Sequence, residues 1–137
     1  VDGVKYYNDS IASSPTRTAL GTLSLYSRKI CIIAGGYDKH IPYEPLGPVI
    51  NDKVKLLILL GDTAPKIEKA VKEASNYDAD EIEIINVTNM EEAVAVARER
   101  STKGDIVSLS PASASFGLYK NFEERGNHFK SIVNALK

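Results

Sequence analysis

The chain has 137 residues, of which 43% are hydrophobic and 26% charged, so it is long enough for one domain with a hydrophobic core. Its formal net charge of −1 excludes the strongly basic surface that nucleic acids or anionic membranes require, so we expect neither as a partner. No apolar run approaches the roughly 20 residues of a membrane span and no signal peptide is recognisable, which predicts a cytoplasmic protein.

The N-terminal part of the chain predicts one strand and one helix. Residues 4–7 are typical of a short strand that leads into a polar turn. Pro15 then stands where a first helical residue is favoured, and Ser14 before it is a candidate N-cap. The helical spacing of apolar residues continues to about residue 26, so we expect the helix to end there.

The next segment is an isoleucine-rich run over residues 29–34, which predicts a strand buried on both faces. The single cysteine, Cys31, lies within it; it cannot form an intramolecular disulfide, and we interpret it as a small buried hydrophobe. The run stops at Gly35-Gly36, and a short helix is expected to begin near residues 43–45.

The middle of the chain repeats the alternation of strand and helix. Residues 54–60, VKLLILL, predict a second buried strand. Pro65 in the first turn introduces an amphipathic helix, whose apolar stripe is Ile67, Ala70, Val71 and Ala74. Residues 81–87 follow as a strand with mixed alternation.

Asn89 is placed to cap the next helix, whose predicted apolar stripe is Met90, Ala93, Val94 and Ala97. We expect Gly104 to end this helical region, and residues 105–109 to form the last clear strand. A long helical pattern then begins near Ser115, with Gly126 as an expected break or kink. The apolar face of its final part is Phe129, Ile132, Val133 and Leu136.

Strand and helix patterns thus alternate along the whole chain, without a repeat or an interdomain linker. This order predicts an α/β fold, with a mostly parallel sheet of about six strands and helices on both faces. Ligands of such sheets bind beyond the carboxyl ends of the strands. Three polar loops, at residues 8–14, 35–40 and 110–115, are expected at that edge, and the loops around Gly61-Asp62 and Thr88 further along it.

The residue types of the three polar loops suit an anion, although each has a simpler structural explanation. Lys39 follows two glycines that let a ligand approach the backbone, and its ammonium could pair with a carboxylate or phosphate, or face solvent. Ser13 and Ser115 stand at expected helix starts, where they could bind an anion or only cap the helix. Asp9 could contact a ribose or form a turn.

Several kinds of site are not indicated by any motif in the sequence. No G-x-G-x-x-G fingerprint opens a helix and no G-x-x-x-x-G-K-[ST] phosphate loop occurs, so we do not expect this domain to hold a nucleotide triphosphate by itself. His40 and His128 are too far apart in sequence to suggest a metal pair, and no metal site is predicted. No nucleophile elbow or convincing catalytic triad is present.

Three segments carry a resemblance to a known family. They are YNDSIASS at residues 7–14, IAGGYDKHIPYEPL at 33–46 and SPASASFGLYKNFEERGNHF at 110–129. In this order and at these distances, they resemble the Mur ligases, and specifically the branch that adds D-glutamate. The resemblance spans nearly the whole chain.

This resemblance implies a Rossmann-like, three-layer C-terminal domain over residues 1–137, taken from a three-domain ligase of peptidoglycan synthesis. The chain begins with Val1 rather than Met, which fits an excised piece. In the family, the N-terminal domain binds the UDP part of UDP-N-acetylmuramoyl-L-alanine, and the central domain holds ATP and Mg²⁺. The C-terminal domain presents D-glutamate, whose amine attacks an acyl phosphate. The isolated chain is therefore expected to be an inactive monomer.

The resemblance also implies roles for individual residues. D-glutamate would be bound by Lys39, Ser115, Ser13, Phe116 and Phe122. Asp9 would contact the ATP ribose when the domains close, and Arg125 would be mainly structural. Asn8 and Ser14 belong to the first of the three segments. Ile11 stands where many members have lysine, so an anion contact from that position is absent.

Two alternatives remain open from the sequence. The chain could belong to another ligase of the same superfamily, adding a different amino acid or extending folate with glutamate. It could also be a non-catalytic α/β module that binds a small molecule. A receiver-like module would need an acidic cluster after its first strand, whereas Asp9 stands nearly alone.

Overall fold

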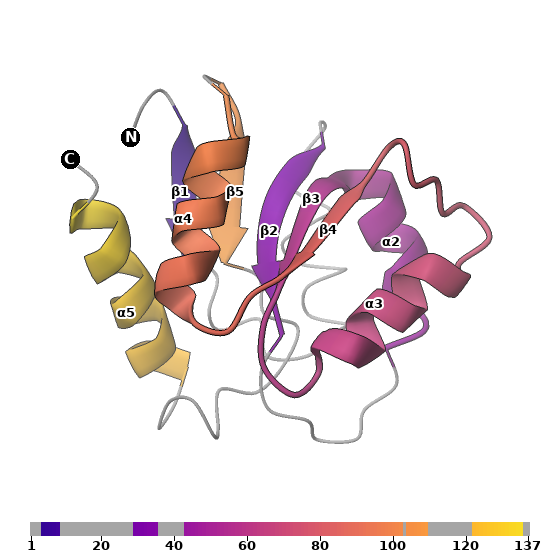
Figure 1. The fold of residues 1–137 in the computed structure, drawn as a ribbon, viewed down its shortest axis with the longest axis horizontal. Helices are drawn as coiled ribbons and strands as arrows, with labels where there is room; N and C mark the ends of the chain where they lie inside the picture. Colours follow the sequence, from indigo (N-terminus) through magenta and orange to yellow (C-terminus); the bar gives the residue numbers. More distant parts are fainter. Residues whose placement is uncertain (1–3, 9–28, 36–42, 103, 110–121, 136–137) are drawn as a thin grey trace.

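The computed structural model describes residues 4–8, 29–35, 43–102, 104–109 and 122–135 (Figure 1). Its strands are β1 (Lys5–Asn8), β2 (Ile30–Ala34), β3 (Val54–Leu59), β4 (Glu83–Asn86) and β5 (Ile106–Leu109). Its helices are α2 (Leu46–Lys53), α3 (Ala64–Glu73), α4 (Met90–Arg100) and α5 (Phe122–Ala135). The predicted helix over residues 15–26 and the predicted helix start near Ser115 lie outside the described residues.

The strands form one five-stranded sheet in the order β1-β5-β2-β3-β4, and every neighbouring pair is parallel. This confirms the predicted parallel sheet, with five strands in the described part where about six were expected. The central strand β2 is buried along its whole length, as its isoleucine-rich sequence predicts.

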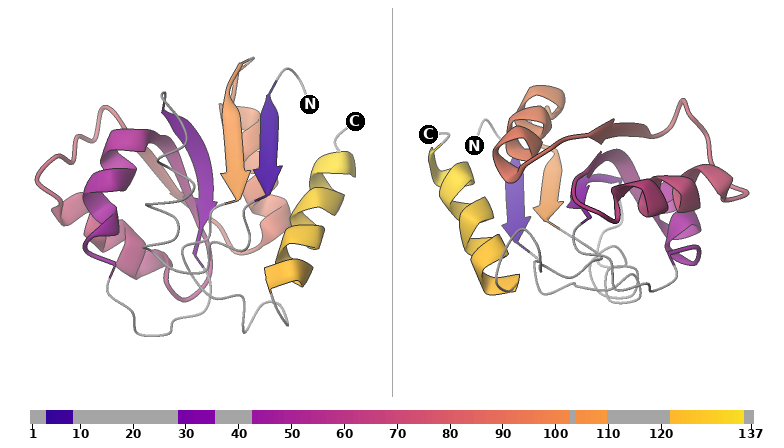
Figure 2. Two further views of the ribbon diagram at one scale, coloured as in Figure 1. Left: turned by 180° about the vertical axis from the view of Figure 1, so that it is seen from behind. Right: turned by 60° about the horizontal axis from the view of Figure 1, so that its bottom comes forward.

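Helices cover both faces of the sheet, which gives the three layers of a Rossmann-like fold (Figure 2). Successive residues of a strand point to opposite faces, so the continuous apolar run of β2 supplies two cores. Ile30, Ile32 and Ala34 pack with α2 and α3, whereas Cys31 and Ile33 pack with α4 and α5. Cys31 is 1% exposed, in agreement with its interpretation as a buried hydrophobe.

The predicted signals for the starts of α3 and α4 are confirmed. Pro65 lies in the first turn of α3. The side chain of Asn89 accepts a hydrogen bond from the backbone N–H of Glu92, at 2.7 Å, and so caps α4. The four residues of the predicted apolar stripe of α4 are all buried.

Two glycine predictions need correction. Helix α4 ends at Arg100, with Ser101 as its C-cap, and Gly104 lies beyond it in the turn before β5, with φ of 94°. Gly126 does not break α5, which continues from Phe122 to Ala135. Gly126 is buried, and tertiary packing of this kind outweighs the low helix propensity of glycine, which is about 1 kcal/mol.

The cap at Asn89 gives the first testable prediction. Asn89→Ala should lower the free energy of unfolding by about 1 kcal/mol, because it leaves the N–H of Glu92 without its partner. Asn89→Asp is the matched control, since a carboxylate keeps the cap and is favoured at a helix N-terminus. Urea denaturation measures both variants. An alanine variant as stable as the parent would show that the cap contributes nothing.

Candidate functional site

The carboxyl ends of three neighbouring strands form the edge of the sheet at which a ligand site is expected. Asn8 at the end of β1 is paired with Leu109 at the end of β5, and Leu109 is also paired with Ile33 of β2. Neighbouring strands lie about 4.8 Å apart, so the three chain segments that follow them start within about 10 Å. The three polar loops predicted from the sequence follow these three strands.

The sheet also has its topological switch point here. After β2 the chain continues to α2 on one face of the sheet, and after β5 it continues to α5 on the opposite face (Figure 1). Strands β2 and β5 are neighbours, so the point at which the chain direction reverses lies between their carboxyl ends. In open α/β sheets, this is the position where ligands bind.

The structure describes three of the predicted site residues. Asn8 is the last residue of β1, and Phe122 is the first residue of α5. Arg125 lies in the first turns of α5 and is only 3% exposed. An arginine is rarely fully buried unless its charge is paired, so Arg125 belongs to the packed interior, and its mainly structural role stays a prediction. The other predicted residues lie outside the described residues and stay predictions: Asp9, Ser13, Ser14, Lys39, Ser115 and Phe116.

The polar residues after β3 and β4 lie further along the same edge, as predicted from the sequence. Two polar side chains, at the end of β4 and just beyond it, form hydrogen bonds with helices. Asn86 donates to Glu68 of α3 at 3.1 Å, and Thr88 donates to Glu92 of α4 at 3.3 Å. Within the described ranges, no group of three or more His, Cys, Asp or Glu side chains could hold a metal ion. No helix in the same ranges is long and apolar enough to cross a membrane.

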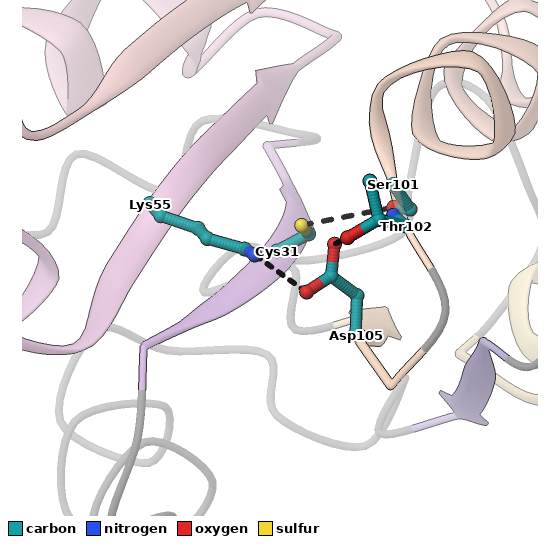
Figure 3. A network of polar contacts seen from close by, with 5 residues as sticks. All are labelled: Cys31, Lys55, Ser101, Thr102 and Asp105. Carbon is teal, nitrogen blue, oxygen red and sulfur yellow. Dashed lines mark hydrogen bonds and ion pairs between the residues drawn. The ribbon is translucent and has the colours of Figure 1, made fainter.

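A second polar cluster, at the amino end of the sheet, was not predicted from the sequence (Figure 3). Asp105, just before β5, accepts a hydrogen bond from the ammonium of Lys55 of β3 at 2.5 Å. It also accepts from the backbone N–H of Thr102 at 2.8 Å and from its hydroxyl at 3.3 Å. The Cys31 thiol lies beside the cluster, 3.8 Å from the hydroxyl of Ser101.

The hydrogen bonds of this cluster pair its charges with each other, which favours a structural role. Burial by itself raises the pKa of Asp105, but the Lys55 ammonium and the two Thr102 donors outweigh it and hold that pKa below its usual value. Burial also raises the pKa of the Cys31 thiol, which makes it a poor nucleophile. The sequence did contain a signal, because Lys55 and Asp105 are charged residues in or directly beside apolar strand runs.

Comparison with known proteins gives a consistent result. The model of the family described as "Mur ligase, glutamate ligase domain" matches residues 1–113. The UDP-N-acetylmuramoylalanine–D-glutamate ligase of Acetivibrio thermocellus is 57% identical and covers 100% of this chain, which corresponds to 30% of that protein. The ligases of the same name from Clostridium botulinum strains Okra and Hall are also 57% identical over 99% of the chain. The chain therefore spans 30% of the length of these curated relatives.

The Asp105 pair predicts a specific pH dependence of stability. Because its pKa is lowered on folding, its contribution is complete above the unfolded pKa of about 3.9 and is lost as the pH falls through the folded pKa. Asp105→Asn should therefore cost about 1–2 kcal/mol at pH 7, and this difference should shrink below about pH 4.

Urea denaturation at pH 7, 4 and 3 measures this difference. The control is Asp52→Asn, at an exposed position of α2, whose stability should parallel that of the parent at each pH. A difference between Asp105→Asn and the parent that is the same at every pH would contradict the assigned role of the charge.

Proposed function

This chain belongs to the Mur ligase family, as its C-terminal glutamate ligase domain, and from that premise we propose that it binds D-glutamate for ATP-dependent amide-bond formation. The acceptor of the D-glutamate is UDP-N-acetylmuramoyl-L-alanine, and the reaction is a cytoplasmic step of peptidoglycan synthesis, on which cell shape and division depend. Support comes from the identity to ligases of this name along the whole chain.

The observation that carries the proposal is the order of the strands. Strands β1, β5 and β2 are separated in sequence but adjacent in the sheet, so the segments with Ser13, Ser115 and Lys39 all begin at one edge. Helices α2 and α5 lie on opposite faces of the sheet, so the topological switch point, where ligands of open α/β sheets bind, is between β2 and β5. A lysine and two serines, in segments that start from this one edge, are the cation and hydroxyl donors that a small dicarboxylate needs.

The chemistry of D-glutamate determines the roles of these residues. Its side-chain carboxylate pairs with the Lys39 ammonium and accepts hydrogen bonds from the hydroxyls of Ser115 and Ser13. Phe116 and Phe122 line the apolar part of the pocket and exclude water from the carboxylate. The α-amine stays outside these contacts, so that it is free to attack the activated acceptor.

The other reactants are assigned to the other domains of the full-length ligase. The sequence contains no phosphate-loop motif, and the described residues contain no metal-binding cluster, so ATP and Mg²⁺ belong mainly to the central domain. ATP supplies the activation of the acceptor carboxylate. Asp9 contributes a ribose contact when the domains close. The isolated chain should therefore bind D-glutamate weakly, as a monomer, and should not catalyse the reaction.

Direct binding to the 137-residue chain tests the first part of the proposal. In a two-dimensional amide NMR titration, D-glutamate should shift the peaks of the segments that follow β2 and β5, and L-glutamate should shift them less. ADP serves as a nucleotide control. Lys39→Ala should abolish the response, whereas Lys69→Ala, an exposed lysine of α3, should leave it unchanged.

Kinetics test the same site in a complete enzyme. We define the fusion ligase as the Acetivibrio thermocellus relative with its matching C-terminal part replaced by this chain. Lys39→Ala should raise the KM for D-glutamate about thirtyfold, since a charge-assisted hydrogen bond is worth about 2 kcal/mol. The KM values for ATP and for the UDP substrate should change less than about twofold. An unchanged KM for D-glutamate would refute the assignment of Lys39.

A further inference from the structure

The segment that carries Lys39 leaves the described fold at Gly35 and re-enters it at Tyr43. The first point contacts the end of β3, and helix α2, which begins three residues after the second point, contacts α3. The attachments are contacts between backbones, which cannot adjust in the way that flexible side chains do. The place of α2 relative to α3 is therefore fixed more tightly than by apolar packing alone.

The exit from β2 is the first attachment. Gly35 has φ of 112°, and a Cβ atom at this position would lie 1.9 Å from the backbone oxygen of Leu60. The backbone N–H of Leu60 donates to the oxygen of Ala34 at 3.1 Å. The end of β2 is thus joined to the end of β3 with no space for a side chain between them.

The second attachment is at the start of α2. Tyr43 is 4% exposed, and its backbone oxygen accepts from the N–H of Leu46 at 2.9 Å. One residue later, a Cβ atom on Gly47 would lie 2.1 Å from the backbone oxygen of Ala70 in α3 and 2.7 Å from its carbonyl carbon. The two helix backbones are therefore in direct contact at Gly47.

A hydrogen-bonded connection holds the other end of α2. Asn51, which is 7% exposed, donates to the backbone oxygen of Val71 at 2.9 Å and to the side-chain oxygen of Asn76 at 3.2 Å. Asn76 donates in turn to the backbone oxygen of Pro48 at 2.9 Å. These directional bonds oppose sliding of α2 along α3, which apolar contacts would tolerate.

We propose that Gly47 and Asn51 are positioning residues for D-glutamate binding, because they fix α2 and thereby the point at which the Lys39 segment re-enters the fold. This inference rests on the proposed function. The backbone contact at Gly47 sets how closely α2 approaches α3, and the bonds of Asn51 set its position along α3. Neither residue touches the ligand. Their effect is to place the cation where the side-chain carboxylate of D-glutamate needs it.

The fusion ligase provides the test. Gly47→Ala forces α2 away from α3 by about 1 Å. A displacement of this size can lower the catalytic efficiency of an enzyme by up to about a hundredfold. We expect the KM for D-glutamate to rise at least about tenfold, with kcat at saturating D-glutamate and the KM values for ATP and the UDP substrate within about twofold. Asn51→Ala should raise the same KM by about threefold.

A control variant separates positioning from general destabilisation. Val94→Ala removes buried volume from α4 on the opposite face of the sheet. It should lower the thermal unfolding temperature and leave the KM for D-glutamate unchanged. If Gly47→Ala does not fold, the KM of Asn51→Ala for D-glutamate tests the positioning role alone.

The outcomes distinguish this inference from the function on which it rests. If Lys39→Ala raises the KM for D-glutamate but folded Gly47→Ala and Asn51→Ala do not, the positioning role is refuted and the binding role of Lys39 stands. A rise of all three KM values in these variants, or a rise in Val94→Ala as well, would also refute it. If Lys39→Ala itself has no effect, the proposed function fails, and the inference fails with it.

Discussion

The pairing of β2 between β5 and β3 is the constraint on which the rest of this structure depends. Every residue of β2 is at most 1% exposed. All five pair with β3 in a parallel ladder, and Cys31, Ile32 and Ile33 also pair with β5 on the other side. Alternation along the strand sends Ile32 into the core under α2 and α3, and Ile33 into the core under α4 and α5. One apolar run therefore holds both helical layers, and a polar side chain within it would be costly. Polar residues that could bind a ligand are therefore expected beyond the ends of β2 and not within it.

The two edges of the sheet have consequently taken different roles. At the amino edge, the charges of Lys55 and Asp105 are paired with each other and the carboxylate is buried. This pair therefore contributes to the packing of the domain at that end of the sheet. At the carboxyl edge, three separate polar segments of the sequence start from the neighbouring strand ends at Asn8, Ala34 and Leu109. The same strand order makes these three strand ends neighbours and places α2 and α5 on opposite faces of the sheet.

The sequence predicted those features that depend on local pattern. The buried strand at β2, Pro65 in the first turn of α3 and the Asn89 cap all follow from neighbouring residues, and the structure has each of them. Features that depend on distant partners were missed. The charges of Lys55 and Asp105 meet only because β3 and β5 flank β2. Gly126 was interpreted as a break because its burial in α5 is a property of the packed domain. The residues expected to bind D-glutamate came from a family resemblance, and the structure adds the common edge from which their segments start.

Gly47 illustrates why an unfavourable local choice can be required by the whole fold. Glycine inside a helix costs about 1 kcal/mol relative to alanine, so propensity alone favours alanine at this position of α2. The contact with the backbone of Ala70 reverses that preference, because any Cβ atom would overlap the carbonyl group. Gly47 allows the backbones of α2 and α3 to approach closely. Asn51 then fixes the position of α2 along α3 through hydrogen bonds to Val71 and Asn76. A helix held in this way has little freedom to shift. For the proposed ligand D-glutamate, which is small and would be held by a few polar contacts, the placement of the proposed cation matters more than the buried area.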